Sequence, residues 1–270
     1  MNDDIRQKHE SNRAAWSEAA RRYADEQEES VAFLRAGGTN FVTPEYDFLR
    51  PLMPCNRAIH LQCAGGRDTL SLWNLGAREV VGIDINDDML SIAQRKSDAL
   101  GATARWIRSD ILETPQELNG TADLVYTGRG AICWLMDLDA WARVVFRLLK
   151  PGGHLYLFDG HPISWVWDME ADHLKLDAEY GDYFDAAVHT DESGWPTTYI
   201  PSEYQPEKPA RKYERQWTLA QIVNAVIGAG LVLEKLGEHP DRYWNAFPNI
   251  PEDVQNKLPQ TLSVLARKPS

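Results

Sequence analysis

The sequence predicts an α/β fold, a doubly wound and mostly parallel sheet of seven strands with helices on both faces. The first observation behind this prediction is that short apolar runs alternate with helical patterns between residues 58 and 158. The second is that the alternation stops after residue 161 and resumes at residue 218. We therefore expect a core made of residues 51–161 and 218–270, interrupted by an insertion over residues 162–217.

The first fifty residues are charged and show a helical period. Trp16, Ala20 and Tyr23 recur at helical spacing and define one amphipathic face. Gly37 and Gly38 then break the pattern. Residues 1–50 are accordingly predicted to form an N-terminal helical cap.

The core elements follow in order. Strands are expected at residues 58–61, 79–84, 104–108, 123–126 and 155–158, and later at 231–233 and 262–266. Helices are expected at residues 68–75, 89–100, 138–148 and 219–226, with Asp68 as the N-cap of the first and Gly230 ending the last. Such sheets bind ligands at the carboxyl ends of their strands.

The insertion is rich in aromatic residues, acids and prolines and has no helical period. Residues 182–189 and 197–204 are predicted to form a small antiparallel pair within it. Because the insertion follows the fifth strand, we expect it to lie over the active site.

Composition excludes several function classes. The formal net charge of −12 disfavours binding to nucleic acid and to anionic membrane surfaces. No apolar run approaches the roughly 20 residues of a membrane helix, and the acidic start is unlike a secretory signal. The three cysteines match neither a disulfide framework nor a metal site. These features predict a cytoplasmic protein without a metal, and a monomer or homodimer is expected.

A nucleotide site is predicted where the first strand meets the first core helix. Gly65 and Gly66 let the backbone approach a ligand closely at a helix start. Asp84 ends the second strand at the spacing of a carboxylate that binds ribose hydroxyls. Asp110 ends the third strand and can accept from an adenine amino group. Both carboxylates have an alternative role as helix caps, although Asn86 or Asp87 can cap the helix that follows Asp84.

The order of the motifs identifies a family resemblance. Residues 148–153 read Leu-Leu-Lys-Pro-Gly-Gly and resemble a hallmark of class I S-adenosylmethionine methyltransferases. Residues 61–70, 82–84 and 109–111 resemble the first three motifs of a bacterial small-molecule branch of that family, and residues 123–126 resemble its fourth strand. The resemblance covers residues 56–160 and, more weakly, 215–268. It implies a Rossmann-like fold and S-adenosyl-L-methionine as the cofactor.

The resemblance also implies a set of cofactor contacts. The sequence departs from the family pattern at His60, which replaces an acidic residue, and at Gln62 and Ala64, which replace glycines. Arg67 is a candidate for the cofactor carboxylate. Ile85 and Ile111 are expected to clamp the adenine ring, and N-terminal aromatics are expected to fold over the cofactor. The predicted cofactor-binding residues are Trp16, Tyr23, Gln62, Cys63, Ala64, Gly65, Gly66, Asp84, Ile85, Asp110, Ile111, Tyr126, Thr127 and Gly128.

The expected reaction is methyl transfer to oxygen or nitrogen of a small, natural-product-like molecule. His161 follows the fifth strand and is the candidate general base. The predicted substrate-binding residues are Arg129, Trp134, Trp165, Trp167, Tyr243 and Trp244. One alternative is a protein or peptide methyltransferase with an open groove at the insertion. Another is a binding protein that kept the fold and lost catalysis.

Overall fold

A computed structural model describes residues 1–197 and 199–270. The main sheet has seven strands in the order β3-β2-β1-β4-β5-β9-β8. β1 to β5 are parallel, and β9 runs antiparallel to both β5 and β8. The predicted Rossmann-like, mostly parallel sheet is therefore confirmed. The strands are β1 (Cys55–Leu61), β2 (Ala77–Asp84), β3 (Ala104–Arg108), β4 (Ala122–Gly128), β5 (Leu149–Gly160), β8 (Val232–His239) and β9 (Thr261–Arg267).

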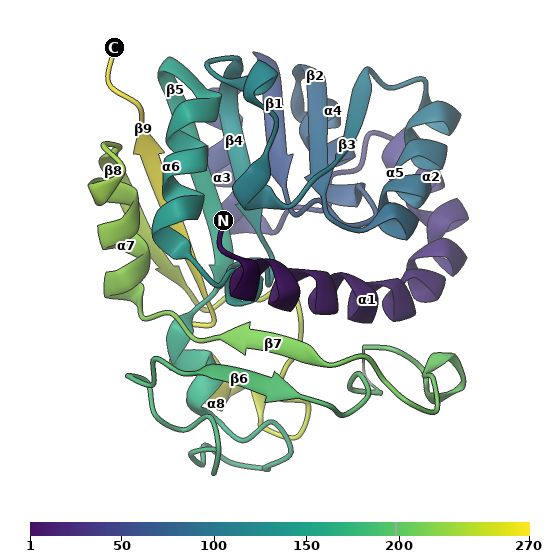
Figure 1. Cartoon of the computed structure of the whole chain (residues 1–270), viewed down its shortest axis with the longest axis vertical. Helices are drawn as coiled ribbons and strands as arrows, with labels where there is room; N and C mark the ends of the chain where they lie inside the picture. The colour runs from purple at the N-terminus through teal and green to yellow at the C-terminus, as the bar shows by residue number, and fades with distance from the viewer. Residues whose placement is uncertain (198) are drawn as a thin grey trace.

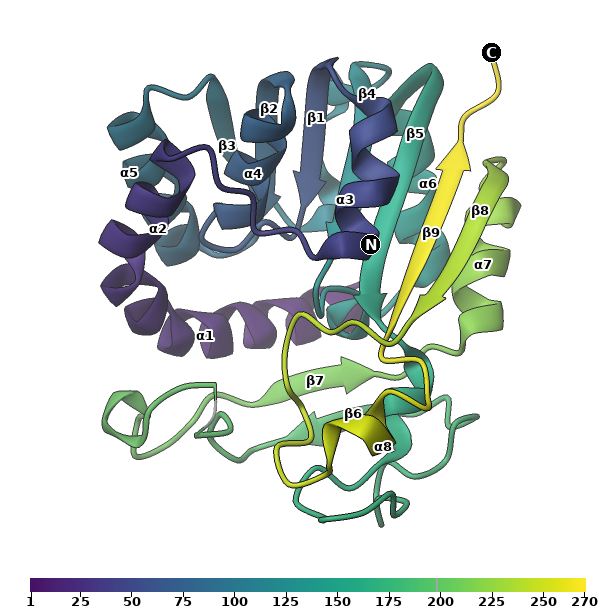
Figure 2. The same cartoon turned by 180° about the vertical axis from the view of Figure 1, so that it is seen from behind.

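Helices cover both faces of the sheet (Figures 1 and 2). Alternating side chains of β1, β2 and β4 enter two different hydrophobic clusters, one with α6 and α7 and one with α3 and α4. This follows from the two-residue period of a strand buried on both faces. The helices that pack on the sheet are α3 (Thr43–Leu49), α4 (Arg67–Leu75), α5 (Asp87–Leu100), α6 (Leu138–Leu148) and α7 (Leu219–Gly228).

The residues that cap the helices determine which polar side chains at the carboxyl ends of the strands remain free to bind a ligand. Asn86 caps α5 by accepting from the backbone N–H of Met89, so Asp84 is not needed for that purpose. The N-cap of α4 is Gly66 rather than the predicted Asp68, which lies in the first turn instead. From β1 the chain adds β2 and β3 on one side of the sheet and then β4 and β5 on the other, so the direction in which strands are added reverses at β1. A ligand site is expected at this reversal.

The insertion pairs differently from the prediction. Its two strands are β6 (Val188–Asp191) and β7 (Lys212–Arg215), so the predicted pairing of residues 182–189 with 197–204 is wrong. The second predicted strand contains Pro201, which has no N–H for a strand ladder. One of its positions, Thr198, lies outside the described residues. The backbone of β7 also has a partner outside the insertion.

That partner is the N-terminal helix α1 (Asp3–Asp25), which lies across the carboxyl ends of the strands with the β6–β7 pair beneath it (Figure 1). Asn12 bonds both backbone groups of Tyr213. Its amide donates to the carbonyl at 2.8 Å and its carbonyl accepts from the N–H at 2.7 Å. Trp195 Nε1 also donates to the carbonyl oxygen of Ala15. We call α1, β6 and β7 together the roof.

The remaining helices are α2 (Gln27–Arg35), which continues from α1, and α8 (Glu252–Gln255). Within the part of the chain that the structure describes, none of the helices combines the length and apolar character that crossing a bilayer requires.

Replacing Asn12 with Ala is expected to lower the free energy of unfolding by about 2 kcal/mol, because two backbone groups of Tyr213 lose their partner. Urea unfolding followed by tryptophan fluorescence measures this loss. Gln7→Ala, at an exposed position of the same helix, is the control and should change stability by no more than about 0.5 kcal/mol. Equal losses in the two variants would contradict the importance of this pairing.

Candidate active site

A cavity of about 710 Å³ lies between the carboxyl ends of the central strands and the roof. Its volume is within the range of small-molecule sites. The structure brings most of the predicted site residues to its wall. These are Trp16, Tyr23, Gln62, Cys63, Ala64, Gly65, Gly66, Asp84, Ile85, Asp110, Ile111, Gly128, Arg129, Trp134, Trp165, Trp167, Tyr243 and Trp244.

The turn after β1 forms part of the cavity wall in a strained conformation. Gln62 and Ala64, which replace family glycines, have left-handed φ angles of 58° and 43°. Such angles cost a non-glycine residue of the order of 1–2 kcal/mol. Gly66 has φ 76°, and a Cβ there would lie 2.6 Å from Trp106 and 2.7 Å from Ala93. The turn therefore keeps its glycine-type geometry although two of its glycines are absent.

Asp84 fixes this turn from the end of β2. The backbone N–H of Ala64 donates to its Oδ2 at 2.8 Å, and the N–H of Asn86 donates to its Oδ1 at 2.9 Å. Burial raises the pKa of Asp84 to about 6. The carboxylate faces the cavity and has lone pairs left for two hydroxyl donors.

Asp110 is held more firmly than the sequence suggests. His9 Nδ1 hydrogen-bonds Asp110 Oδ2 at 2.6 Å, and the backbone N–H of Leu112 donates to Oδ1. The N–H of Met136 donates to the other ring nitrogen of His9, so the proton of a neutral ring lies on Nδ1. Asp110 thus has a capping role and joins α1 to the end of β3, while it still lines the cavity beside Ile111.

Three basic side chains surround the strained turn. Arg67 lines the cavity, and its Nε is buried without a hydrogen-bond partner among the described residues. Lys96 donates to the carbonyl of Gly65 at 3.0 Å, and burial lowers its pKa to about 8. His60 bonds Thr69 Oγ1, and burial lowers its pKa to about 4. A neutral ring therefore occupies the position of the family's acidic residue.

Aromatic side chains line the inner surface of the roof. The ring centroid of Trp16 lies 4.8 Å from that of Trp195 and 5.5 Å from that of Trp134. Tyr23 and Tyr199 share a hydrogen bond between their hydroxyls. Trp195 and Tyr199 were not predicted as site residues. They come from the irregular part of the insertion, where the sequence has no period that indicates which side chains point inward.

Asp159, at the end of β5, shapes the loop after β4. Its carboxylate accepts from the backbone N–H groups of Gly130, Ala131, Ile132 and Gly160 at 2.6–3.0 Å. These bonds fix the short helix η4 (Ile132–Trp134) and so the position of Trp134. The carboxylate of Asp159 therefore has a structural role in this loop and is not free to bind a ligand.

Arg129 lines the cavity in the same loop and is also restrained. It has φ 61°, and its guanidinium pairs with the fully buried Glu45 at 2.7 Å. Tyr126 donates to the same carboxylate at 2.7 Å. The buried ion pair attaches the β4 loop to α3.

Three predicted site residues do not line the cavity. Tyr126 and Thr127 are fully buried in the sheet, so of the predicted β4 contacts only Gly128 and Arg129 reach the cavity wall. His161 Nε2 bonds Glu238 at 2.9 Å, and its Nδ1 accepts from the N–H of Ile163. Both ring nitrogens are engaged, and burial lowers the pKa of the ring. The structure therefore does not place His161 as a general base.

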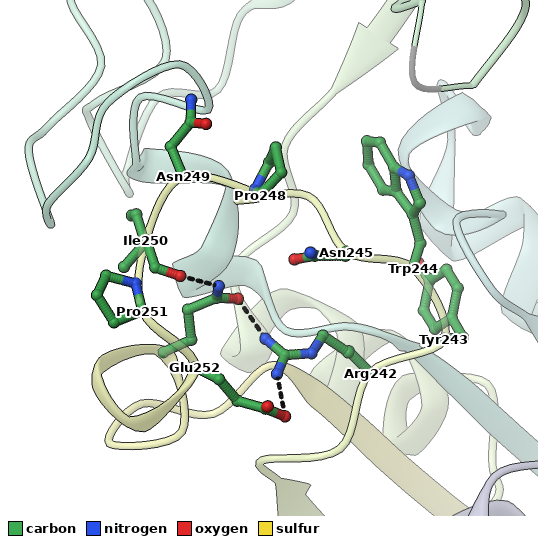
Figure 3. A pocket seen from close by; sticks show the side chains of 10 residues that line it. Arg242, Tyr243, Trp244, Asn245, Pro248, Asn249, Ile250, Pro251 and Glu252 are labelled. Atoms are coloured by element: carbon green, nitrogen blue, oxygen red, sulfur yellow. Dashed lines mark hydrogen bonds and ion pairs between the residues drawn. The ribbon is translucent and has the colours of Figure 1, made fainter.

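A second hollow of about 590 Å³ lies along the segment that carries Tyr243 and Trp244 (Figure 3). Arg242 bridges Glu252 and Gln255 there, and Gln255 also donates to the carbonyl of Ile250. These bonds brace the segment whose two aromatic residues also line the main cavity.

Comparison with known proteins agrees with this geometry. Residues 58–153 match the family model of a methyltransferase domain. The demethylmenaquinone methyltransferase of Thermus thermophilus is 34% identical over 84 residues, which cover 31% of this chain and 37% of that protein. A solved S-adenosylmethionine-dependent methyltransferase from Mesorhizobium loti is similar with a TM-score of 0.60 and 22% identity, covering 83% of this chain and 97% of that one.

A second similar structure holds a small substrate. It is a geranyl diphosphate C-methyltransferase from Streptomyces coelicolor A3(2) in complex with Mg²⁺, geranyl diphosphate and S-adenosyl-L-homocysteine. Its TM-score is 0.55 at 16% identity, with coverage of 84% of this chain and 78% of that one. The chain spans less than half the length of the curated relatives it matches. The resemblance is confirmed at the level of the domain and of the class I S-adenosylmethionine-dependent methyltransferase fold.

The buried His60 makes folding stability depend on pH. Its pKa is about 4 in the folded protein and about 6.5 in an unfolded chain, so between these values only the unfolded chain takes up the proton. Lowering the pH from 7 to 5 should cost the wild type about 2 kcal/mol more than it costs His60→Gln. Asp84 acts in the opposite direction, but it is present in both proteins and cancels.

Urea unfolding of the two proteins at both pH values measures the difference. His173→Gln, at an exposed histidine, serves as the control and should keep the wild-type pH dependence. Identical slopes for wild type and His60→Gln would show that His60 is not held neutral by burial.

Proposed function

We propose that this chain, whose residues 58–153 form a methyltransferase domain, is an S-adenosylmethionine-dependent methyltransferase that acts on oxygen or nitrogen of a small-molecule acceptor. One observation carries the proposal. The strained turn after β1 and the Asp84 carboxylate face a roofed cavity whose opposite wall is aromatic.

The residues of the turn fit the cofactor expected for this fold. The Asp84 carboxylate would accept from both ribose hydroxyls, and Asp110 would accept from the adenine amino group between Ile85 and Ile111. Arg67, with its buried unpartnered Nε, would bind the cofactor carboxylate. Trp16 and Tyr23 of α1 would cover the cofactor from the roof. The backbone from Gln62 to Gly66, together with Gly128, would line its length.

Bound S-adenosylmethionine would supply a methyl group on a positively charged sulfur. The protein then has to align the acceptor with that methyl group and exclude water. The roof serves the second purpose, because α1 and β7 are joined to each other by Asn12 and α1 is joined to the sheet by His9. Neither task requires His161.

The acceptor side of the cavity favours a small, natural-product-like molecule. Trp134, Trp165, Trp167 and Trp244 would supply its apolar surface, with Arg129 and Tyr243 nearby. A roofed cavity fits a small molecule better than the open groove that a peptide acceptor needs. The geranyl diphosphate methyltransferase shows that this fold can hold such a substrate.

We extend the proposal to the organisation of the chain. Residues 1–50 act as a helical cap, residues 51–161 and 218–270 as the methyltransferase core, and residues 162–217 as the substrate-side insertion. The acidic composition supports an enzyme that does not act on nucleic acid, and the three scattered cysteines support a cytoplasmic setting. Both a monomer and a homodimer are compatible with this proposal.

Asp84→Asn should weaken the binding of S-adenosylmethionine by roughly 1.5–3 kcal/mol, the scale of hydrogen bonds to a charged group. Titration calorimetry with S-adenosylmethionine and S-adenosylhomocysteine measures the loss. Asp88→Asn removes the same charge from an exposed position in the first turn of α5 and should leave affinity unchanged. If the wild type bound neither S-adenosylmethionine nor S-adenosylhomocysteine, the proposed function would be refuted.

The raised pKa of Asp84 predicts a pH dependence for cofactor binding. As the pH falls through about 6, Asp84 takes up a proton and loses the charge that attracts the ribose hydroxyls. Affinity should fall by up to about tenfold per pH unit below that value. The same titrations repeated between pH 7.5 and 5 should give a flat profile for Asp84→Asn, and a flat profile for the wild type would remove Asp84 from the ribose site.

A further inference from the structure

Apart from the exposed Glu170, one carboxylate of the cavity wall accepts no hydrogen bond from the residues that the structure describes. Glu214 lies in β7, on the roof side of the cavity, and is half-buried. No hydrogen bond to its side chain is formed within residues 1–197 and 199–270. Withdrawing a carboxylate even partly from water without giving it a donor is costly, so its presence in the wall requires an explanation.

The other carboxylates of this wall, apart from the exposed Glu170, accept hydrogen bonds from the protein. They are Glu26, Asp68, Asp84, Asp110, Asp168, Asp177 and Asp191. Their bonds hold turns, helix starts and the roof in place. Glu214 differs from them because its acceptor capacity is free.

Nearby groups do not neutralise Glu214. Lys212 is two residues away in the same strand, but its Nζ is bound by Asp191 Oδ2 at 3.0 Å and by the carbonyl of Ser193 at 2.6 Å. On α1, which also packs against β7, Lys8 pairs with Asp4 and His9 with Asp110. The other ionisable groups around Glu214 are Asp191 and His189 of β6, Tyr180 of the insertion and Cys133 of η4.

Glu214 also lies near the transfer site expected from the fold. β7 packs against η4, the short helix that follows β4 and carries Trp134. Trp134, Trp195 and Tyr180 line the same cavity. A cavity wall that holds both a free carboxylate and aromatic side chains can bind an organic cation, through an ion pair and cation–π contacts.

We propose that Glu214 binds a basic nitrogen of the methyl acceptor and takes its proton, so that the acceptor is a small amine. This inference rests on the proposed function and selects nitrogen over oxygen. The free carboxylate carries the argument, since apart from the exposed Glu170 it is the carboxylate of the described wall that accepts no hydrogen bond from the protein.

The reaction is balanced with the methyl donor as the only co-reactant. The protonated amine binds to ionised Glu214 and transfers one proton to it, which leaves a neutral nitrogen with a lone pair. That lone pair forms the new N–C bond while the C–S bond breaks, and the bonding electrons remain on sulfur. The product leaves as an N-methylated ammonium, and Glu214 then releases its proton to water.

The proton affinity of Glu214 suits this role. Burial raises its pKa to about 7, with Asp191 contributing in the same direction. A base works best when its pKa is close to the working pH. An aliphatic alcohol holds its proton too strongly for the ionised Glu214 carboxylate to remove it, whereas an ammonium gives up its proton far more readily.

Matched probes test the inference directly. Benzylamine, phenethylamine and tryptamine are compared with benzyl alcohol, 2-phenylethanol and tryptophol, so each pair differs only in the amine or hydroxyl. Binding to the protein loaded with S-adenosylhomocysteine is followed by quenching of tryptophan fluorescence, since six tryptophans line the cavity. Each amine should bind about 10- to 100-fold more tightly than its alcohol at pH 7.5.

Glu214→Gln keeps the size of the side chain and removes the charge. It should reduce the preference for amines to within about threefold and abolish the fall in amine affinity between pH 8 and pH 6. Glu170→Gln, which removes a charge from an exposed carboxylate of the same cavity, is the control and should keep the preference. An unchanged melting temperature or a higher one would show that Glu214→Gln is folded, because a half-buried charge without a partner has been removed.

Three outcomes would overturn the inference. Amines and alcohols of equal affinity, a preference that survives in Glu214→Gln, or no amine binding at millimolar concentration each exclude Glu214 as the amine site. Calorimetry with S-adenosylhomocysteine on the same variant separates this from the proposed function. Normal cofactor binding with no preference for amines would reject only the amine acceptor. Loss of cofactor binding in the wild type as well would reject the proposed methyltransferase function.

Discussion

The site depends on the pairing of Asn12 with the backbone of Tyr213. A helix side chain here replaces a neighbouring strand, because it satisfies one donor and one acceptor of β7 at once. The same helix is bound to the end of β3 through His9 and Asp110. These attachments help to hold the roof over the ends of the strands, where it covers the turn after β1.

The sequence predicted what depends on local pattern. The strands and helices were indicated by local hydrophobic periods. The glycine turn and Asp84 lie close together in the chain, and both fall at the cavity because parallel strands end at one edge of the sheet. Residues whose direction depends on distant partners were not predictable in this way. Tyr126 turns toward Glu45 instead of the cavity, and His161 is engaged by Glu238. β7 pairs with β6 and with α1 across an irregular insertion, so no pattern in the sequence indicated that Glu214 faces the cavity.

The acidic groups in and around the cavity fall into three kinds. Asp159 is saturated by backbone N–H groups and acts as a structural anion that shapes the loop after β4. Asp84 is shared, since it supports the strained turn and still faces the cavity. Glu214 is left free. Because these other carboxylates are held by hydrogen bonds from the protein, this strongly acidic chain can leave Glu214 available for a ligand without altering their structural roles.

The roof also has a consequence for how the protein is made. Asn12 and Tyr213 are 201 residues apart, so α1 leaves the ribosome long before the strand it binds has been synthesised. The core strands through β5 can pair while α1 still lacks part of its contact surface. Closing so long a loop comes late in folding. A nascent chain that stops before residue 213 therefore carries the turn after β1 without the roof that covers it.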